Sequence, residues 1–150
     1  MKFILTKELG RLAKWLRILG FDTVYFKEEN KGLLLIEALR ENRIIVTRNQ
    51  RISKERGPKV INIKKEDLKE QLKQIIEELK LTLDKEKMFS RCVICNLELE
   101  YIEKDKAKER VPEYVFNTQE NFYLCKGCKR IYWQGTHWGN VAKTLGEIGC

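Results

Sequence analysis

The sequence predicts an α/β protein with a mostly parallel sheet, helices on both faces of that sheet, and a small cysteine-rich module after it. Two observations lead to this fold class. Residues 1–80 alternate short apolar runs with segments of helical periodicity, and residues 81–150 contain two Cys-x-x-Cys pairs. Alternating strands and helices are typical of parallel sheets that helices cover. We therefore expect an α/β domain over residues 1–80, and a linker and a four-cysteine ribbon over residues 81–150.

The elements of the first eighty residues follow from apolar spacing. Short runs rich in β-branched and aromatic residues predict strands, and apolar residues recurring every three or four positions predict helices. In chain order we expect a strand at 3–5, a helix at 7–19, a strand at 23–26, a helix at 33–41, strands at 43–47 and 60–63, and a helix at 66–79. In the second helix, Leu35, Ala38 and Leu39 are expected to face the sheet.

The carboxyl ends of these strands indicate where chemistry should take place, because open parallel sheets bind their ligands there. The segments at these ends are Thr6, residues 27–30, residues 47–49 and residues 64–67. Thr6 and Asn49 follow two of the strands at the same edge of the sheet. We therefore expect them to face one cleft.

Two pairs of cysteines form the most specific pattern in the chain. Each pair, Cys92 with Cys95 and Cys125 with Cys128, is separated by two residues, so both sulfurs of a pair can turn toward one ion. Together they predict a tetrahedral Zn²⁺ site, whose role is structural because four thiolates leave no position for water. Two disulfides or four unrelated thiols are the alternative. Between the pairs we expect strands at 98–102 and 121–124, and Cys150 is expected to be incidental.

Charge is concentrated in the first half of the chain. The net charge is +8, and residues 1–80 carry 19 Lys and Arg against 12 Asp and Glu, while residues 81–150 carry 11 against 10. A polyanion, most simply a nucleic acid, should therefore meet the first half. Lys7, Arg11, Lys14 and Arg17 share one side of the first helix, which is either a solvated face or a phosphate-binding stripe.

Two further observations bear on cellular context. No apolar run approaches the length of a membrane span, which is about 18 residues. The apolar run at the start of the sequence is too short, and polar residues follow it too closely, for a signal peptide. Cysteines gathered in metal-binding pairs suit a reducing compartment. We expect a cytoplasmic protein with no membrane partner.

An aromatic stretch follows the second cysteine pair. Residues 132–138, YWQGTHW, are the densest aromatic segment and contain His137, the only histidine. These rings either pack around the ribbon or stack on unpaired bases. For His137 we expect a structural hydrogen bond rather than a place among the metal ligands.

Four blocks of sequence, in this order, resemble the Mut-seven-C ribonuclease-type family. They are residues 3–23 (FILTKELGRLAKWLRILGFDT), 44–48 (IIVTR), 89–96 (FSRCVICN) and 132–138 (YWQGTHW). The resemblance spans nearly the whole chain. It implies a PIN-like α/β fold joined to a zinc ribbon, RNA as the partner, and, in active relatives, RNA cleavage with a divalent metal that carboxylates hold.

The chain departs from the family pattern at the positions of those carboxylates. The resemblance implies acidic residues where this chain has Thr6, Asn49, and Asn30 with Lys31. Cleavage with Mg²⁺ or Mn²⁺ needs several carboxylate oxygens around the ions, and neutral oxygens are weaker ligands for hard cations. Asp22 enters its strand at the opposite end from the site. The carboxylates left near the strand ends are Glu8, Glu28, Glu29, Glu66 and Asp67.

Two functions of different classes remain. The preferred one is an RNA-binding protein whose acidic metal site is degenerate, with structured or ribosomal RNA as the target. Its expected nucleic-acid contacts are Lys7, Arg11, Lys14, Arg17, Arg48 and Arg51. The alternative is an active endoribonuclease that uses Mg²⁺ or Mn²⁺ on shifted carboxylates, for example Glu28, Glu29 and Glu66. A protein-interaction module built on the ribbon is a third possibility.

Overall fold

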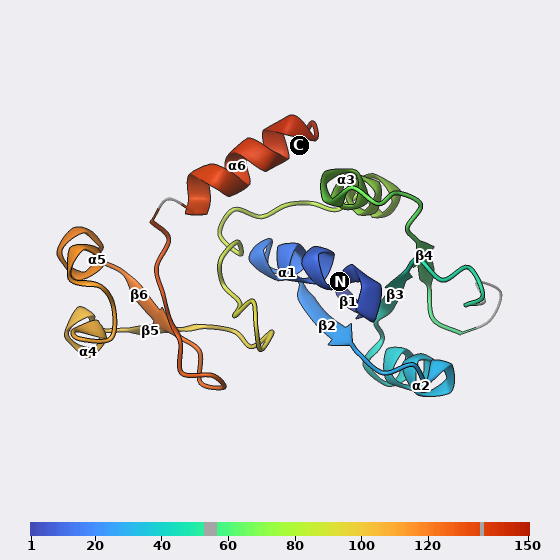
Figure 1. Ribbon diagram of the computed structural model, residues 1–150, viewed down its shortest axis with the longest axis horizontal. Helices are drawn as coiled ribbons and strands as arrows, with labels where there is room; N and C mark the ends of the chain where they lie inside the picture. Colours follow the sequence, from blue (N-terminus) through green and yellow to red (C-terminus); the bar gives the residue numbers. More distant parts are fainter. Residues whose placement is uncertain (53–56, 136) are drawn as a thin grey trace.

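The computed structural model describes residues 1–52, 57–135 and 137–150, except for the side chains of His137 and Trp138. It contains a four-stranded parallel sheet and a separate three-stranded antiparallel sheet (Figure 1). Helices flank the parallel sheet, so the fold class expected from the sequence is confirmed. No described helix has the length and apolar character needed to cross a membrane.

The parallel sheet is built around the first strand. Its members are β1 (Lys2–Thr6), β2 (Asp22–Phe26), β3 (Ile44–Thr47) and β4 (Val60–Asn62), in the order β2-β1-β3-β4. Leu5 of β1 is in register with Tyr25 of β2 and Val46 of β3. Because β1 has a strand on each side and helices on both faces, its central residues are completely buried.

Successive residues of β1 contribute to two different apolar clusters. Phe3 and Leu5 pack with the short 3₁₀ segment η1 (Lys7–Leu9), with α1 (Gly10–Ile18) and with α3 (Leu68–Leu79). Ile4 points to the other face, where it packs with α2 (Lys31–Glu41). This alternation is the two-residue period of a strand, and it puts helices on both faces of the sheet.

One expectation about α2 was wrong. Leu34 and Ala38, which are four residues apart, are buried against the sheet, whereas Leu39 is 58% exposed and Ile36 is 54% exposed. A helix that lies on one face of a sheet needs a single apolar stripe, and residues four apart supply it. Leu39 therefore lies outside that stripe.

The cysteine-containing half forms the antiparallel sheet β5-β6-β7. The expected strands are present as β5 (Glu100–Ile102) and β6 (Phe122–Leu124), and β7 (Ile131–Tyr132) was not anticipated. Two short helices, α4 (Lys104–Ala107) and α5 (Glu113–Thr118), lie between β5 and β6. Ala107, Val115 and Phe122 form a small core beneath them.

The last helix returns to the first half of the chain. In α6 (His137–Glu147), Val141 and Leu145 join the same buried cluster as α1 and α3, and so does Ile148 just after the helix. Figure 1 shows α6 beside α3. These apolar residues recur at spacings of four and three, a helical pattern that was readable in the sequence. The division between residues 80 and 81 stays a prediction.

A hydrogen-bonded junction holds the first cysteine pair against the parallel sheet. Arg17, which is 8% exposed, donates through Nε to the Thr23 carbonyl at 2.9 Å and through Nη1 to the Val93 and Ile94 carbonyls at 2.8 and 3.1 Å. Asn96 accepts from the Thr23 amide at 2.9 Å. Each of these bonds joins residues that are distant in sequence, except Arg17 to Thr23.

Asp22, the first residue of β2, links this junction to Arg43, which directly precedes β3. Its Oδ1 accepts from Arg43 Nη1 and from Asn96 Nδ2, both at 2.7 Å. Partial burial raises the pKa of Asp22, but the hydrogen bonds from Arg43 and Asn96 and the charges of Arg43 and Arg91 outweigh it, so the net pKa lies below the usual value. Asp22 is therefore ionised at neutral pH.

Gly20→Ala should destabilise the protein. Gly20 has φ of +95°, and a Cβ atom there would lie 2.5 Å from the Lys87 carbonyl oxygen. Both the backbone conformation and the contact disfavour a side chain, so we expect a loss of more than about 1 kcal/mol in the free energy of unfolding, measured by denaturant titration. Gly146→Ala is the control, since its Cβ would meet nothing within 4 Å in α6. An equal effect of both substitutions would contradict the packing of Gly20.

Asp22→Asn should remove about 1 to 3 kcal/mol of stability at pH 7, because Arg43 loses a charged hydrogen-bond partner. The folded-state pKa of Asp22 lies below its unfolded value of about 3.9, so its stabilisation is complete above that value and is lost as the pH falls through the folded-state pKa. The difference between variant and wild type should therefore shrink in acid. Asp105→Asn, at an exposed position of α4, should change the free energy of unfolding little at any pH. A loss of stability in Asp22→Asn that does not depend on pH would refute the role of the Asp22 charge.

Candidate functional site

Two threonines meet where β1 and β3 end. Thr6 is the last residue of β1 and Thr47 is the last residue of β3, and these strands are neighbours in the sheet. The chain leaves β1 toward β2 on one side, and β3 toward β4 on the other, so the strand order reverses between them. Such reversal points are where open parallel sheets bind ligands.

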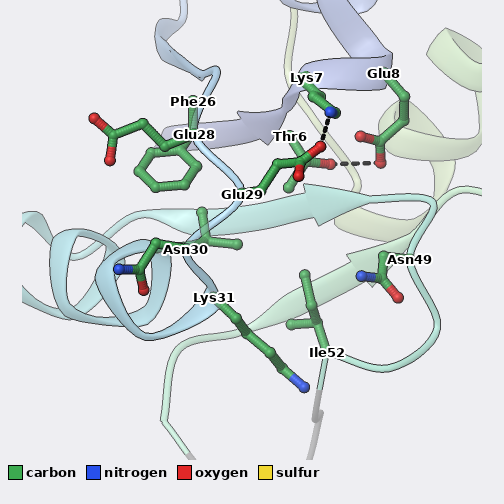
Figure 2. Close-up of a pocket in the computed structure, with 11 residues that line it drawn as sticks. Thr6, Lys7, Glu8, Phe26, Glu28, Glu29, Asn30, Lys31, Asn49 and Ile52 are labelled. Atoms are coloured by element: carbon green, nitrogen blue, oxygen red, sulfur yellow. Dashed lines mark hydrogen bonds and ion pairs between the residues drawn. The ribbon is translucent and has the colours of Figure 1, made fainter.

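The carboxylate of Glu8 lies against both threonines. The Thr6 hydroxyl donates to Glu8 Oε1 at 2.6 Å (Figure 2). Thr47 Oγ1 is 3.2 Å from the same oxygen. The backbone amide of Arg48 also donates to Glu8 Oε1, at 3.0 Å. The two hydroxyl oxygens lie 2.9 Å apart. One carboxylate oxygen therefore has three hydrogen-bond partners.

These bonds determine the charge of Glu8. Partial burial raises its pKa, but the Thr6 hydroxyl, the Arg48 amide, the amide of Glu8 itself and the Thr47 hydroxyl together outweigh burial, and the net pKa lies below the usual value. Each of these groups stabilises the ionised form. Glu8 is thus a fixed negative charge at the strand ends.

A pocket of about 230 Å³ opens beside this network (Figure 2). Five residues that the sequence places near the strand ends line this pocket: Thr6, Asn49, Glu8, Glu28 and Glu29. Its lining consists of Thr6, Lys7, Glu8, Phe26, Glu28, Glu29, Asn30, Lys31, Leu34, Asn49 and Ile52. The expected cleft is therefore present, and it holds three carboxylates and two ammonium groups.

The carboxylates do not converge as a metal site requires. Within residues 1–52, 57–135 and 137–150, no three carboxylates come close enough to share one ion. Glu29 forms an ion pair with Lys7 across the pocket (Figure 2). Glu66 is 88% exposed and lies 3.9 Å from Arg48, and Asp67 accepts from the Glu70 amide at 3.2 Å as the cap of α3. Glu28, Glu29 and Glu66 thus do not form a replacement cluster.

Two asparagines occupy positions where the family pattern implies acids, and both bind local backbone. Asn30 Oδ1 accepts from the Leu33 amide at 3.0 Å and caps α2. Asn49 Oδ1 accepts from the Arg51 amide at 2.9 Å in the turn after β3. Asparagine and aspartate are equally good caps, so these residues keep the local structure while removing negative charge.

The expected nucleic-acid contacts fall into different environments. Arg11 and Lys14 are exposed on α1 and have no ion-pair partner among the described residues, whereas Arg17 is buried in the junction with the first cysteine pair. Lys7 pairs with Glu29, and Arg48 lies near Glu66. Arg51 is exposed, and its carbonyl accepts from Lys31 Nζ. The basic stripe of α1 is thus reduced to Arg11 and Lys14.

The four paired cysteines lie together at a second site. Their sulfur atoms are all within 4.8 Å of one another, and none of them forms a disulfide. Cys92 Sγ and Cys128 Sγ are 3.7 Å apart, close to the roughly 3.8 Å that a tetrahedral ion with bonds of about 2.3 Å requires. The cluster is therefore consistent with a structural zinc site.

Groups around Cys92 favour its thiolate form. The Tyr132 hydroxyl is 3.0 Å from Cys92 Sγ, and the Cys95 amide donates to that sulfur at 3.3 Å. Burial raises the pKa of Cys92, but these bonds outweigh it and lower the pKa to about 7. The Tyr132 contact was not foreseen from the sequence, which shows only that an aromatic stretch follows the second pair. The hydrogen bond expected of His137 lies outside the described side chains.

Comparison with known proteins identifies a family. Neither the curated proteins nor the solved structures gave a significant match. The model of the Mut7-C RNAse domain family matches residues 1–145, almost the full length of the 150-residue chain. The match covers the parallel sheet, the strand-end pocket and the cysteine cluster together. This chain therefore belongs to the Mut7-C RNAse domain family.

Proposed function

We propose that this protein binds RNA and does not cleave it. RNA as a partner is supported by membership in an RNase family and by the charge of +7 that residues 1–80 carry. The lack of cleavage is supported by the pocket at the strand ends. Thr6 and Asn49 contribute neutral oxygens to its lining where the family resemblance implies carboxylates, and the threonines hold Glu8, one of its three glutamates, in place.

The main observation behind this proposal is that the Glu8 carboxylate already accepts hydrogen bonds from protein groups. Activating water and neutralising a leaving oxygen takes one or two dications, which several carboxylates must hold. Here one oxygen of a single carboxylate already accepts from Thr6 and Arg48, and the nearest described acidic neighbours do not join it in a metal cluster. Because no three described carboxylates converge on one position, we expect weak affinity for Mg²⁺ or Mn²⁺ and no metal-bound water.

We further propose that Cys92, Cys95, Cys125 and Cys128 hold one structural Zn²⁺. The sulfur geometry fits a tetrahedral ion, and the hydrogen bonds from Tyr132 and the Cys95 amide orient and stabilise a thiolate at Cys92. Zinc would close the loop that carries α4 and α5, whose own apolar core is small. Its role would be to fix the ribbon against α1.

Wild-type protein should retain labelled RNA on a filter in both Mn²⁺ and EDTA, and the RNA should stay intact in both. Thr6→Asp combined with Asn49→Asp should raise Mn²⁺ affinity at least about tenfold in a calorimetric titration, because it adds two carboxylates to the Glu8 network. Asn117→Asp with Asn121→Asp adds the same charge at exposed positions of the ribbon half and should not. Cleavage by wild type that EDTA and Glu8→Gln or Glu28→Gln abolish would establish the alternative, an active endoribonuclease.

Freshly purified protein should contain about one zinc per chain by elemental analysis. Cys92→Ser should lose it and expose residues 92–132 to hydrogen exchange, because metal binding contributes directly to the folding free energy of small zinc modules. Cys150→Ser, at an exposed cysteine outside the cluster, should keep both zinc and protection. Zinc-free protein with a protected ribbon would overturn the assignment.

A further inference from the structure

A second pocket lies between the ribbon and the two helices α1 and α6. It has a volume of about 370 Å³, within the range of small-ligand sites. Trp15 comes from α1, Tyr132 and Trp133 from β7 and the residue after it, and Asn140 from α6. Its wall is mainly apolar, with five aromatic side chains, and it also carries polar groups of Arg91, Gln134, Asn140 and Thr144. Such a wall suits a flat ring that carries hydrogen-bonding groups on its edge.

Part of this wall is held in position before any ligand arrives. The Tyr132 hydroxyl is bonded to Cys92 Sγ, so the ring cannot swing away without losing that contact. Trp133 packs against the small core of Ala107, Val115 and Phe122. Arg91 donates to the Asn96 carbonyl at 2.7 Å and lies 3.5 Å from Glu98. The pocket is therefore preformed, which lowers the entropic cost of binding.

Two shallower hollows connect this pocket to the basic side of α1. The ribbon hollow, of about 460 Å³, shares Val93, Tyr132 and Trp133 with the aromatic pocket. The α1 hollow, of about 410 Å³, shares Val93 and Ile94 with the ribbon hollow. The three depressions thus have lining residues in common within the first cysteine pair.

All charged residues that line the two hollows are basic. The ribbon hollow carries Arg110, Lys129 and Arg130, and the α1 hollow carries Arg11, Lys14, Arg17 and Lys27. Apart from Arg17, these side chains belong to exposed residues. The strand-end pocket, in contrast, has three glutamates against two lysines. A chain of phosphates therefore finds attraction along the hollows and repulsion from the strand-end pocket.

We propose that a single-stranded RNA segment crosses the first cysteine pair from the basic side of α1 to the ribbon, and places one unpaired base in the aromatic pocket beside Trp133. A cationic track combined with aromatic stacking is how single strands are held. This inference rests on the proposed RNA binding and deepens it by naming the surface and the single-stranded form. The strand-end pocket is then not the principal contact with RNA.

The first measurement concerns the track. Binding of a fluorescent 12-nucleotide RNA in EDTA is followed at several salt concentrations for wild type and for Lys14→Ala, Lys27→Ala, Arg130→Ala combined. At about 0.7 per phosphate contact on a single strand, the triple variant should lower the log-log salt slope by about two. Lys59→Ala, Lys73→Ala, Lys143→Ala removes equal charge from exposed positions outside the hollows and should leave the slope unchanged.

The second measurement concerns the base. The wild-type protein should bind the intact oligonucleotide about five- to one-hundredfold more tightly than the same oligonucleotide with an abasic site in place of the base that enters the aromatic pocket. Trp133→Ala should lose this difference in affinity. Trp133→Phe should keep most of it. Because Trp133 also packs in the ribbon, Asn140→Trp offers a second route, since it fills the pocket from an exposed position of α6 without removing a core side chain.

The outcomes separate the two proposals. If wild type binds neither single-stranded nor duplex RNA, the proposed function fails. If the wild-type protein binds RNA but both triple variants lower the log-log salt slope equally, RNA binds elsewhere and the proposed path along the hollows is refuted. The same conclusion follows if folded Trp133→Ala and Asn140→Trp variants still distinguish the intact oligonucleotide from the abasic one. If wild type binds an acidic peptide at the pocket in preference to RNA, the surface is a protein-interaction site and the inference is likewise overturned.

Discussion

The parallel pairing of β1 between β2 and β3 determines which parts of this protein meet. Phe3, Ile4 and Leu5 are fully buried, because strands flank β1 on both sides and helices cover both faces. Parallel pairing also brings the carboxyl ends of β1 and β3 to one edge. Thr6 and Thr47 are therefore neighbours although 41 positions separate them in sequence. Every property of the strand-end pocket follows from this adjacency.

Neutral side chains stand at this edge at positions where the family resemblance led us to expect acidic residues, and they bind local backbone. Asn30 and Asn49 still supply the local backbone hydrogen bonds that aspartates would supply, and Thr6 and Thr47 bond to each other and to Glu8. Asparagine at these positions therefore preserves the local backbone hydrogen bonds that aspartate could also form. Three carboxylates, those of Glu8, Glu28 and Glu29, line the pocket beside these neutral side chains.

The cysteine ribbon is a part of the same body as the α/β half. Arg17 reaches the backbone of the first cysteine pair, Asn96 bonds to Asp22 and Thr23, and α6 returns Val141 and Leu145 to the cluster beneath α1. Burying an arginine in this way leaves its charge close to the thiolates, which compensates part of its desolvation. It also places basic side chains of α1 and the ribbon residues Tyr132 and Trp133 next to the same two residues, Val93 and Ile94.

The sequence by itself determined the helices and strands of residues 1–80, the parallel sheet, the cysteine pairs and the polar positions at the strand ends, because apolar periodicity and two-residue cysteine spacing are local signals. It did not predict α4, α5, α6 or β7. Packing alone decided the rest. Arg17 lies three residues after Lys14, in the basic stripe expected on the helix surface, yet it is buried. Glu8 looks in the sequence like a solvated helix residue, yet it accepts hydrogen bonds from Thr6, Thr47 and the Arg48 amide. The charge of a side chain is visible in sequence, but its exposure and its partners depend on contacts between segments distant along the chain, which only the folded structure brings together.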